Sequence, residues 1–413
     1  MRLVLILILA TASVSQGATT LEWSSLLRKV YDQNSDLQSL VRSRDAAQYQ
    51  RSAVKSDYMP SLFAFGDRTR EEQETSLLNK DLTTDTYGLK ASWNLFNGFS
   101  TYNTVRKYNF EERQAESQIR TKMADLRYDL RRAYFQMLIS QRAQRTWSKL
   151  LRLQTDQLSV VQIKYNNGGE ALWSVELSKA NVEVTKATIE LEVNNFNTAK
   201  KDVEVLLGEP LPEEIILNDD IDSQLKMNVK GEVTDAHPDL MFLQDQVNEA
   251  WADSAIQKAG FSPNLRANLQ WAKAKPEDQE TVNDNRFSLT LTLPLFEGFS
   301  TINQTSRTRA VALSREFTLR DSRLRLLKNV EQARSLFVAN LTYLRAKELE
   351  VKATNMWSGT IEKQYRLGVR KYSDWDQAQT KMITSERDYL KSLRDTLDSR
   401  ITLEKALAVT EAL

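Results

Sequence analysis

The residue types that most often carry chemistry are scarce in this chain. It holds one histidine, His237, and no cysteine. A hydrolytic triad or a zinc site needs partners that this sequence does not supply, and the lack of cysteine excludes disulfides, thiolate ligands and a lipid-modified N-terminal cysteine. His237 precedes Pro238 in "DAHPDL", a pattern typical of a helix start, so we interpret it as structural. The sequence predicts no catalytic residue, no metal site and no cofactor, and a protein that is not an enzyme.

Charge and hydropathy narrow the class of protein further. The chain has 56 Lys and Arg against 55 Asp and Glu, so no overall field attracts nucleic acid or an acidic partner. A mean hydropathy of -0.50 argues against a bundle of membrane-spanning helices. Only 12 glycines and 7 prolines occur in 413 residues, which favours a largely helical chain.

The N-terminus has the pattern of a secretory signal peptide. Arg2 is followed by an apolar run from Leu3 to Ala10 and by Ser15-Gln16-Gly17, a small-x-small cleavage pattern. We predict that residues 1–17 are removed after Gly17. A membrane anchor fits less well, because the apolar run is shorter than the ~20 residues of a spanning helix. No later stretch reaches that length, so a mature chain that enters a membrane must do so as strands.

The elements that would position any functional residue occur twice. Tyr165 and Gly168 have counterparts 200 residues later in Tyr365 and Gly368, and "NSDLQSL" and "HPDLMFL" match at a shift of 203. A tandem duplication explains this order of landmarks. We expect a first repeat over residues 18–207, a linker over 208–232 and a second repeat over 233–413. The expected elements are helix 21–58, strands 62–73 and 84–96, helices 99–166 and 170–207, then helix 233–260, strands 264–275 and 285–296, and helices 299–366 and 370–408.

Two helices are predicted to be very long. Residues 99–166 and 299–366 contain no proline and a single glycine, Gly359, so each would extend about 100 Å at 1.5 Å per residue. Apolar residues in the first recur at spacings of three and four, which favours a coiled-coil seam. The seam residues are Ile119, Met123, Leu126, Leu130, Ala133 and Met137.

The corners between strands and helices carry residues with special backbone properties. Gly98 and Gly298 stand where a strand gives way to a long helix, and glycine can take the backbone angles that such a corner demands. Pro60 and Pro263 stand where a helix gives way to a strand, and proline stops the helix before it.

The predicted strands alternate apolar and polar residues. In "RFSLTLTLPLFEGFST", Phe287, Leu289, Leu291, Leu293 and Leu295 share one face, and "TYGLKASWNLFNGFST" repeats the pattern from Tyr87. Strands of about ten residues with a lipid face and a water face match those that cross an outer membrane, although half of a soluble sandwich remains the alternative for each strand alone. Four strands cannot close a barrel, and an open edge is not tolerated in lipid, so several chains must contribute.

The motifs "DYMPSL", "WNLFNGFST" and "LPLFEGFST", with the paired Tyr-x-x-Gly turns, resemble the TolC family of outer-membrane efflux and secretion ducts. The resemblance covers nearly the whole mature chain. It implies a mainly α fold with a small β part: a homotrimer in which tandem-repeat coiled-coil helices form an α-barrel through the periplasm and twelve strands form one transmembrane β-barrel. It also implies two further partners, a periplasmic adaptor protein and an inner-membrane pump.

The resemblance assigns roles to the turns between the long helices. Tyr365, Gly368 and Arg370 fit the Tyr-x-x-Gly-x-Arg tip of the family, in which tyrosine and arginine hold a closed periplasmic aperture, and Asp374 falls at an acidic position of the pattern. Together with Tyr165 and Gly168, Tyr365 and Gly368 would contact the adaptor. By composition alone, each glycine simply ends a helix.

The first repeat departs from the family pattern. Ser174 stands where the family can carry an aspartate, so the acid that would receive Arg370 is missing there, and Glu170 is a candidate substitute. An exposed Arg370 with no latch function is the alternative.

Two functions follow from these observations. The first is the outer-membrane channel of a tripartite efflux or type I secretion system, embedded in outer-membrane lipid and giving passive exit from a large periplasmic portion. The alternative is a soluble periplasmic coiled-coil scaffold whose strands form a small water-facing sheet. A secreted hydrolase is excluded by the residue inventory.

Overall fold

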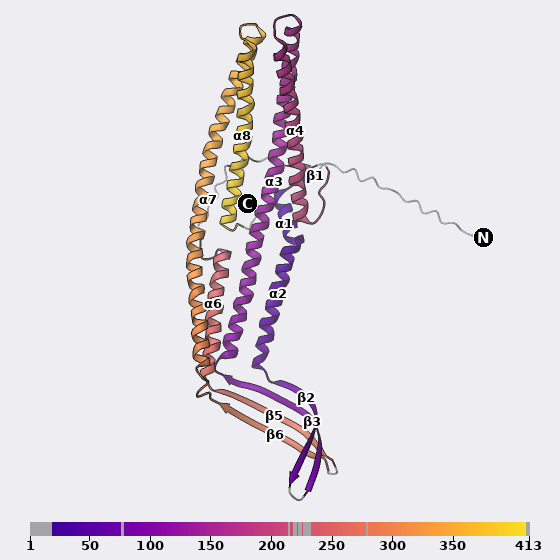
Figure 1. The fold of residues 1–413 in the computed structure, drawn as a ribbon, viewed down its shortest axis with the longest axis vertical. Helices are drawn as coiled ribbons and strands as arrows, with labels where there is room; N and C mark the ends of the chain where they lie inside the picture. Colours follow the sequence, from indigo (N-terminus) through magenta and orange to yellow (C-terminus); the bar gives the residue numbers. More distant parts are fainter. Residues whose placement is uncertain are drawn as a thin grey trace, which may run out of the picture. The chain divides into compact units, whose positions relative to one another are not determined.

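The computed structural model describes residues 19–75, 78–213, 215–217, 221, 225, 233–277 and 280–409. The predicted signal peptide lies outside the described residues, as does much of the expected linker. The chain forms two compact units (Figure 1). We call them the helical unit (Met1–Gln38, Lys122–Glu232 and Lys328–Leu413) and the sheet unit (Ser39–Thr121 and Val233–Leu327).

Four long helices dominate the fold, as two antiparallel hairpins (Figure 1). Helices α3 (Ser100–Asn166) and α7 (Ser300–Arg366) have 67 residues each, which corresponds to about 100 Å. They turn back into α4 (Leu172–Leu207) and α8 (Tyr372–Ala406). All four lie within two residues of the predicted bounds. No helix in the described part of the chain is both long and apolar enough to span a membrane.

The predicted seam of α3 is buried from Leu126 to Met137, within the helical unit. Leu130 and Met137 are fully buried, and Leu126 and Ala133 are nearly so. Further along, Trp147 and Leu150 of α3 pack with Met382 and Leu390 of α8. The predicted mainly α fold with a small β part is confirmed.

The expected helix 21–58 is interrupted. Helix α1 (Trp23–Gln33) ends at Asn34, whose backbone is extended, and α2 (Ser35–Lys55) begins directly after it. The Asn34 side chain accepts a hydrogen bond from the Leu37 amide at 3.1 Å, as a helix-capping residue does. The helical pattern continues across the break, so periodicity alone did not reveal it.

The corresponding helix of the second repeat, α6 (Pro238–Lys258), begins later than expected. His237 is its N-cap residue and accepts a hydrogen bond from the Asp239 amide through Nδ1 at 3.3 Å. The only histidine of the chain therefore has a structural contact at a helix start.

A small parallel sheet was not predicted. Strand β1 (Thr19–Leu21) pairs with β4 (Ile215–Leu217), which lies within the stretch expected to be a linker. Strands of three residues are too short for an alternation of apolar and polar side chains to identify them.

The main sheet belongs to the sheet unit and has the antiparallel order β2-β3-β5-β6. Its strands are β2 (Ser61–Thr75), β3 (Leu78–Asn97), β5 (Asn264–Pro276) and β6 (Val282–Thr292). The outer edges of β2 and β6 have no partner strand among the described residues.

Strand β6 ends four residues before the predicted limit of 296. Its last pair joins Thr292 to Asn264, the first residue of β5, so no residue of β5 remains to pair with the segment that follows. Pro294, in that segment, also lacks an amide hydrogen for a ladder bond. The equivalent end of β3 continues to Asn97 because β5 pairs with it.

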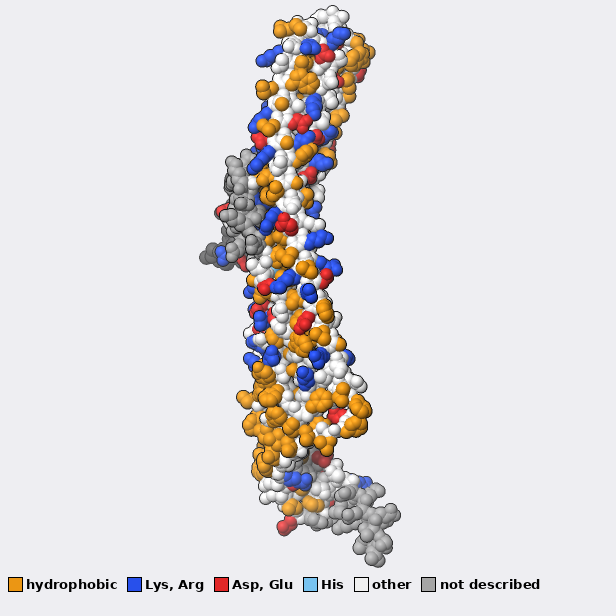
Figure 2. Space-filling view, turned by 90° about the vertical axis from the view of Figure 1, so that its left-hand side faces the viewer, with side chains coloured by type: hydrophobic (Ala, Val, Ile, Leu, Met, Phe, Trp, Pro, Cys, Tyr) orange, Lys and Arg blue, Asp and Glu red, His pale blue; other side chains and the backbone are white. Residues whose placement is uncertain are grey.

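Both corners between a strand and a long helix contain two consecutive residues with positive φ. Gly98 and Gly298 have φ of 64° and 60°, and Phe99 and Phe299 have φ of 66° and 65°. Left-handed backbone costs a residue with a Cβ atom about 1–2 kcal/mol, so the folded corners must hold each phenylalanine in place. Exposed apolar side chains gather at the start of α7 (Figure 2), where Phe261, Leu295 and Phe299 line a small pocket.

Candidate functional site

An aromatic cluster lies at the ends of the helix hairpins, in the helical unit. Tyr365 of α7 stacks on Trp375 of α8, with ring centroids 4.5 Å apart. Tyr372 meets both rings edge-on. Val161 and Val175 bring α3 and α4 into the same buried cluster. The cluster therefore joins the α3–α4 hairpin to the α7–α8 hairpin by apolar packing.

Tyr365 also makes polar contacts with the α3–α4 hairpin. Its hydroxyl donates a hydrogen bond to Glu170 Oε1 at 2.9 Å. Lys164 Nζ donates to the Tyr365 carbonyl at 2.6 Å and lies 3.8 Å from the centroid of its ring. Burial raises the pKa of Tyr365 well above its ordinary value, and the hydrogen bond to the Glu170 carboxylate raises it further. Tyr365 is thus a neutral donor held in place by an anion and a cation.

A second contact between the hairpins lies beside the first. The hydroxyls of Ser178 on α4 and Tyr372 on α8 are 2.9 Å apart and share a hydrogen bond. Trp173 meets the Tyr372 ring edge-on at 5.4 Å between centroids. Burial raises the pKa of Tyr372, so this hydroxyl is also neutral.

Arg370 remains within its own hairpin. Its Nε donates to Gln364 Oε1 at 3.2 Å, and its Nη1 lies 3.7 Å from Asp374 Oδ2. Ser174 is buried and donates to the Ala171 carbonyl at 2.6 Å. The structure thus brings Tyr365 and Glu170 together, and it places Arg370 with Asp374. Within one chain the Glu170 carboxylate accepts the Tyr365 hydroxyl, and its role as the acceptor for Arg370 stays a prediction.

The glycines of both turns end their helices in the same way. Gly168 and Gly368 have φ of 73° and 76°, and their amides donate to the carbonyls of Tyr165 and Tyr365. A Cβ added at either glycine would meet no atom within 4 Å, so the requirement for glycine is conformational. Tyr165 is half-buried against the aromatic cluster. Four apolar side chains around the turns are exposed: Leu172, Trp173, Leu367 and Val369.

A polar pocket of about 210 Å³ lies next to the aromatic cluster, between α3, α4 and α8. Gln154, Gln157 and Gln379 line it and are more than nine-tenths buried. Each has a side-chain polar atom with no hydrogen-bond partner among the described residues. Asp376, also on the lining, has a pKa raised by burial. The packing between the hairpins is therefore apolar at the aromatic cluster and polar beside it.

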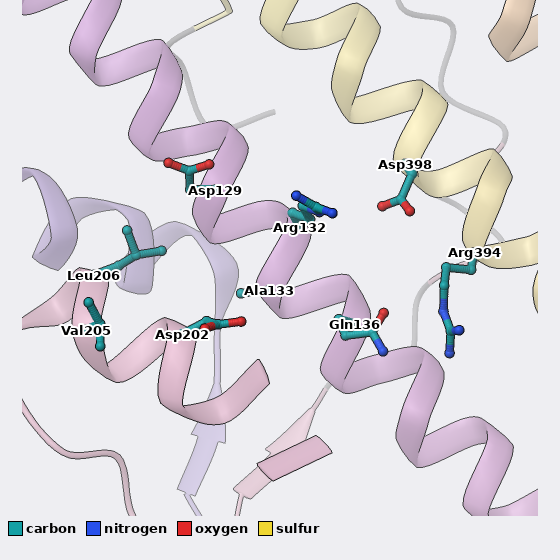
Figure 3. A pocket seen from close by; sticks show the side chains of 9 residues that line it. All are labelled: Asp129, Arg132, Ala133, Gln136, Asp202, Val205, Leu206, Arg394 and Asp398. Carbon is teal, nitrogen blue, oxygen red and sulfur yellow. The ribbon is translucent and has the colours of Figure 1, made fainter. Parts of the chain in front are cut away.

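A larger pocket, of about 590 Å³, lies elsewhere between α3, α4 and α8 (Figure 3). Arg132 of α3 extends toward Asp398 of α8, Arg394 of α8 points away from it, and Asp202 comes from α4 (Figure 3). Burial raises the pKa of Asp398, and the two arginines oppose that effect. The mixture of charges on mostly accessible side chains selects no single ligand chemistry.

A buried charged cluster joins α3 to α8. Glu404 accepts hydrogen bonds from Arg127 at 2.6 Å, Arg131 at 3.0 Å and Arg400 at 3.0 Å, and all four side chains are almost inaccessible. Burial lowers the pKa of Arg131 to about 10, and Glu404 counteracts that effect. Breaking such a buried group is costly, so the cluster fixes how α8 lies on α3.

Comparison with known proteins identifies the family of the chain. The model of the outer membrane efflux protein family matches residues 26–209 and 231–409. The chain belongs to this family. The resemblance to outer-membrane efflux ducts that the motifs indicated is confirmed. No curated protein sequence matches the chain significantly.

Solved structures show the same fold at low sequence identity. The outer membrane protein VceC of Vibrio cholerae is 15% identical, with a TM-score of 0.79, over 94% of this chain and 96% of VceC. The open state of the MtrE outer membrane channel of Neisseria gonorrhoeae is 16% identical, with a TM-score of 0.81, over 94% and 89%. CusC is 16% identical, with a TM-score of 0.83, over 96% and 95%.

The sequence singled out Tyr365 but did not indicate the residues that contact it. Lys164 precedes the singled-out Tyr165, yet nothing in one sequence relates it to a residue 201 positions later. Tyr372 and Trp375 carried a signal, since they lie three residues apart and so face the same side of α8.

Proposed function

We propose that this protein is the passive outer-membrane exit duct of a tripartite efflux or type I secretion system. Three copies would close one β-barrel in the outer membrane and one helical tunnel in the periplasm. The duct would perform no catalysis, and its energy would come from an inner-membrane pump. One observation carries the proposal: in this member of an outer membrane efflux family, the sheet has an exposed apolar face and two edges without a partner strand among the described residues.

Directly paired residues put apolar side chains in rows across the sheet. One row contains Leu62, Ala91, Leu269 and Phe287. The large members of this row are exposed: Leu62 by 69%, Leu269 by 53% and Phe287 by 71%. Such a face is stable in lipid and unfavourable in water.

Apart from Phe63 and Phe65 of β2, the opposite face of the sheet is mainly polar, and its side chains form hydrogen bonds with one another. The Ser92 hydroxyl donates to Asn268 Oδ1 at 3.0 Å, and Arg266 Nε donates to Asn94 Oδ1 at 3.0 Å. Side chains that satisfy one another while facing water suit the lumen of a barrel.

The apolar face has a defined end. Arg68 donates two hydrogen bonds to Asp85, at 2.6 and 2.8 Å, and Lys275 pairs with Asp85 in the sheet. From Tyr87 to Leu95 the apolar positions of β3 cover about 27 Å of strand, or a little over 20 Å at a tilt near 40°. That height agrees with the apolar band of about 25 Å on outer-membrane barrels.

The polar contacts of Tyr365 would act as the latch of a gate. They join the two hairpins at their ends, and the adjacent polar pocket lowers the cost of separating them. The glutamine atoms of this pocket that have no hydrogen-bond partner among the described residues would gain hydrogen bonds to water when α8 moves away from α3 and α4. The exposed apolar side chains of the turns, Leu367 and Val369 among them, would contact a periplasmic adaptor.

The test is fractionation of cells that express the full chain, followed by gel electrophoresis with and without heating. We expect the protein in the outer-membrane fraction, migrating unheated at three times the mass of the heated chain. The purified trimer should also form discrete conducting channels in planar bilayers. A soluble periplasmic monomer would contradict the proposal and favour the coiled-coil scaffold.

A further inference from the structure

The internal repeat is preserved in the pairing register of the sheet. For β2 residues Ser61 to Glu71, adding 203 to the residue and 200 to its partner in β3 gives an observed pair of β5 and β6. Leu62 with Ala91 becomes Leu265 with Leu291, and Phe65 with Gly88 becomes Asn268 with Ser288. The two β-hairpins are therefore equivalent in register as well as in sequence.

The two β-hairpins are joined by the pairing of β3 with β5, and this joint occurs once in the sheet of one chain. It pairs Lys90 with Gln270 and Trp93 with Ala267. Its counterpart would join β6 to a strand equivalent to β5, and within the repeat that strand is β2. The β2 of the same chain lies at the opposite edge of the sheet. A second copy can supply the missing strand.

The segment that follows β6 has the properties of a strand without its partner. Residues 293–297 are equivalent to residues 93–97, which belong to β3 and pair only with β5. Leu293 is 53% exposed, Leu295 89% and Phe296 75%. In lipid these apolar side chains are favourable, but the unpaired backbone groups of the segment are not.

The corner at Gly298, which follows this segment, also lacks the packing that its counterpart at Gly98 has. A Cβ on Gly98 would lie 2.5 Å from the Ser262 Cβ and 2.8 Å from the Ala259 carbonyl oxygen, so this corner is packed against the turn before β5. A Cβ on Gly298 would meet nothing within 4 Å. The repeat equates Ala259 and Ser262 with Ser56 and Met59, at the turn before β2.

We propose that β6 pairs antiparallel with β2 of a second copy in the register that the β3–β5 joint dictates. Thr290 then lies opposite the partner's Asp67, and Leu293 opposite the partner's Ala64. Residues 293–297 become strand on that pairing, and Gly298 packs against the partner's turn at Ser56 and Met59. The inference rests on the proposed barrel and adds the residues that form its subunit joint.

Disulfide crosslinking tests the register, because the chain has no cysteine of its own. Opposed residues on antiparallel strands have Cα atoms about 4.5–5.5 Å apart, within disulfide range. A slip of two residues keeps the side-chain faces but moves the partner by about 7 Å along the strand, which takes the pair out of range.

The double variant Thr290→Cys with Asp67→Cys is expected to form covalently linked dimers and trimers, seen on non-reducing gels of boiled outer membranes. The slipped pairs, Thr290→Cys with Phe65→Cys or Thr69→Cys, are expected to form at least tenfold fewer. The matched control is Lys90→Cys with Gln270→Cys, which should crosslink within one chain and leave its boiled mass unchanged. Leu293→Cys with Ala64→Cys tests the extension of β6 in the same way.

Heat-resistant trimers that crosslink through a slipped pair, or through no pair, would overturn the register and leave the proposed duct standing. A failure of Leu293→Cys with Ala64→Cys, when Thr290→Cys with Asp67→Cys succeeds, would overturn the extension of the strand. Absence of trimers in the parent chain without cysteine would overturn both the joint and the proposed function.

Discussion

At the scale of single residues, Tyr365 concentrates the contacts between the two helix hairpins. Its ring packs on Trp375 of its own hairpin, while its hydroxyl and carbonyl bond to Glu170 and Lys164 of the other. Arg370, the other latch residue that the resemblance implies, bonds only within its own hairpin among the described residues. The tyrosine is therefore the residue whose change should most weaken the closed state.

We predict that Tyr365→Phe opens the proposed channel more often without unfolding it. The change removes the bond to the Glu170 carboxylate and keeps the ring, at a cost of about 1–2 kcal/mol to the closed state, equivalent to a 5–30-fold shift. The measurement is the fraction of time that single channels conduct in planar bilayers. Tyr165→Phe is the matched control, because no hydrogen bond of its hydroxyl is seen among the described residues. Equal open fractions for both variants would show that the hydroxyl is not a latch.

At the scale of elements, α7 and α8 are held together by a polar network as well as by apolar packing. Glu350 of α7 accepts hydrogen bonds from Lys347 of the same helix at 2.8 Å and from Lys381 of α8 at 2.6 Å. Lys347 also donates to Asp388 of α8 at 3.2 Å. Hydrogen bonds from Lys347 and Lys381 lower the pKa of Glu350 to about 2.

This network predicts a loss of stability in acid. The folded pKa of Glu350 is about 2 against 4.5 for an unperturbed carboxyl, so its contribution is complete above pH 4.5 and disappears as the pH falls toward 2. Because the network is partly exposed, we expect about 1 kcal/mol. Thermal unfolding followed by circular dichroism should show Glu350→Gln less stable than the parent at pH 6, with the difference vanishing near pH 2.

The control for this prediction is Glu331→Gln, an exposed position on α7 for which the described part of the chain shows no ion pair. It removes the same charge without breaking the contact between α7 and α8. If both variants lose stability equally at pH 6, net charge and not the network governs the acid response.

At the scale of the whole molecule, the sheet makes one chain incomplete. In the part of the chain that the structure describes, its apolar face is exposed, its two outer edges have no partner strand, and the end of β6 has no residue of β5 to pair with. Each of these costs is removed when further copies close the sheet in lipid. Assembly and membrane insertion are therefore expected to occur together.

The two faces of the sheet should respond oppositely to a charge. Leu289 lies on the apolar face opposite Ala267, and arginine near the middle of a lipid face costs about 2–4 kcal/mol. We expect Leu289→Arg to reduce the heat-resistant trimers in outer membranes severalfold. Ser288→Arg, one residue away on the polar face, should leave their amount nearly unchanged. The lipid-facing assignment fails if the two variants assemble equally well.

The sequence alone determined the features that depend on neighbours along the chain. Alternation with a period of two located the strands and their faces, uninterrupted helical periodicity located four long helices to within two residues, and the duplicated glycines marked the turns and corners. These signals are local, because a backbone conformation is chosen over a few residues. Even so, the break at Asn34 escaped, since one capping side chain interrupts a helix without interrupting its pattern.

Only the tertiary structure decided which distant groups meet. Glu170 could have received Arg370 or Tyr365, and the packing of the aromatic cluster gave it the tyrosine, 195 residues away. The gathering of Arg127, Arg131 and Arg400 around Glu404 left no trace in periodicity either. The end of β6 depended on where β5 begins. Such pairings are fixed by the geometry with which whole helices and strands pack, and a linear pattern does not contain that geometry.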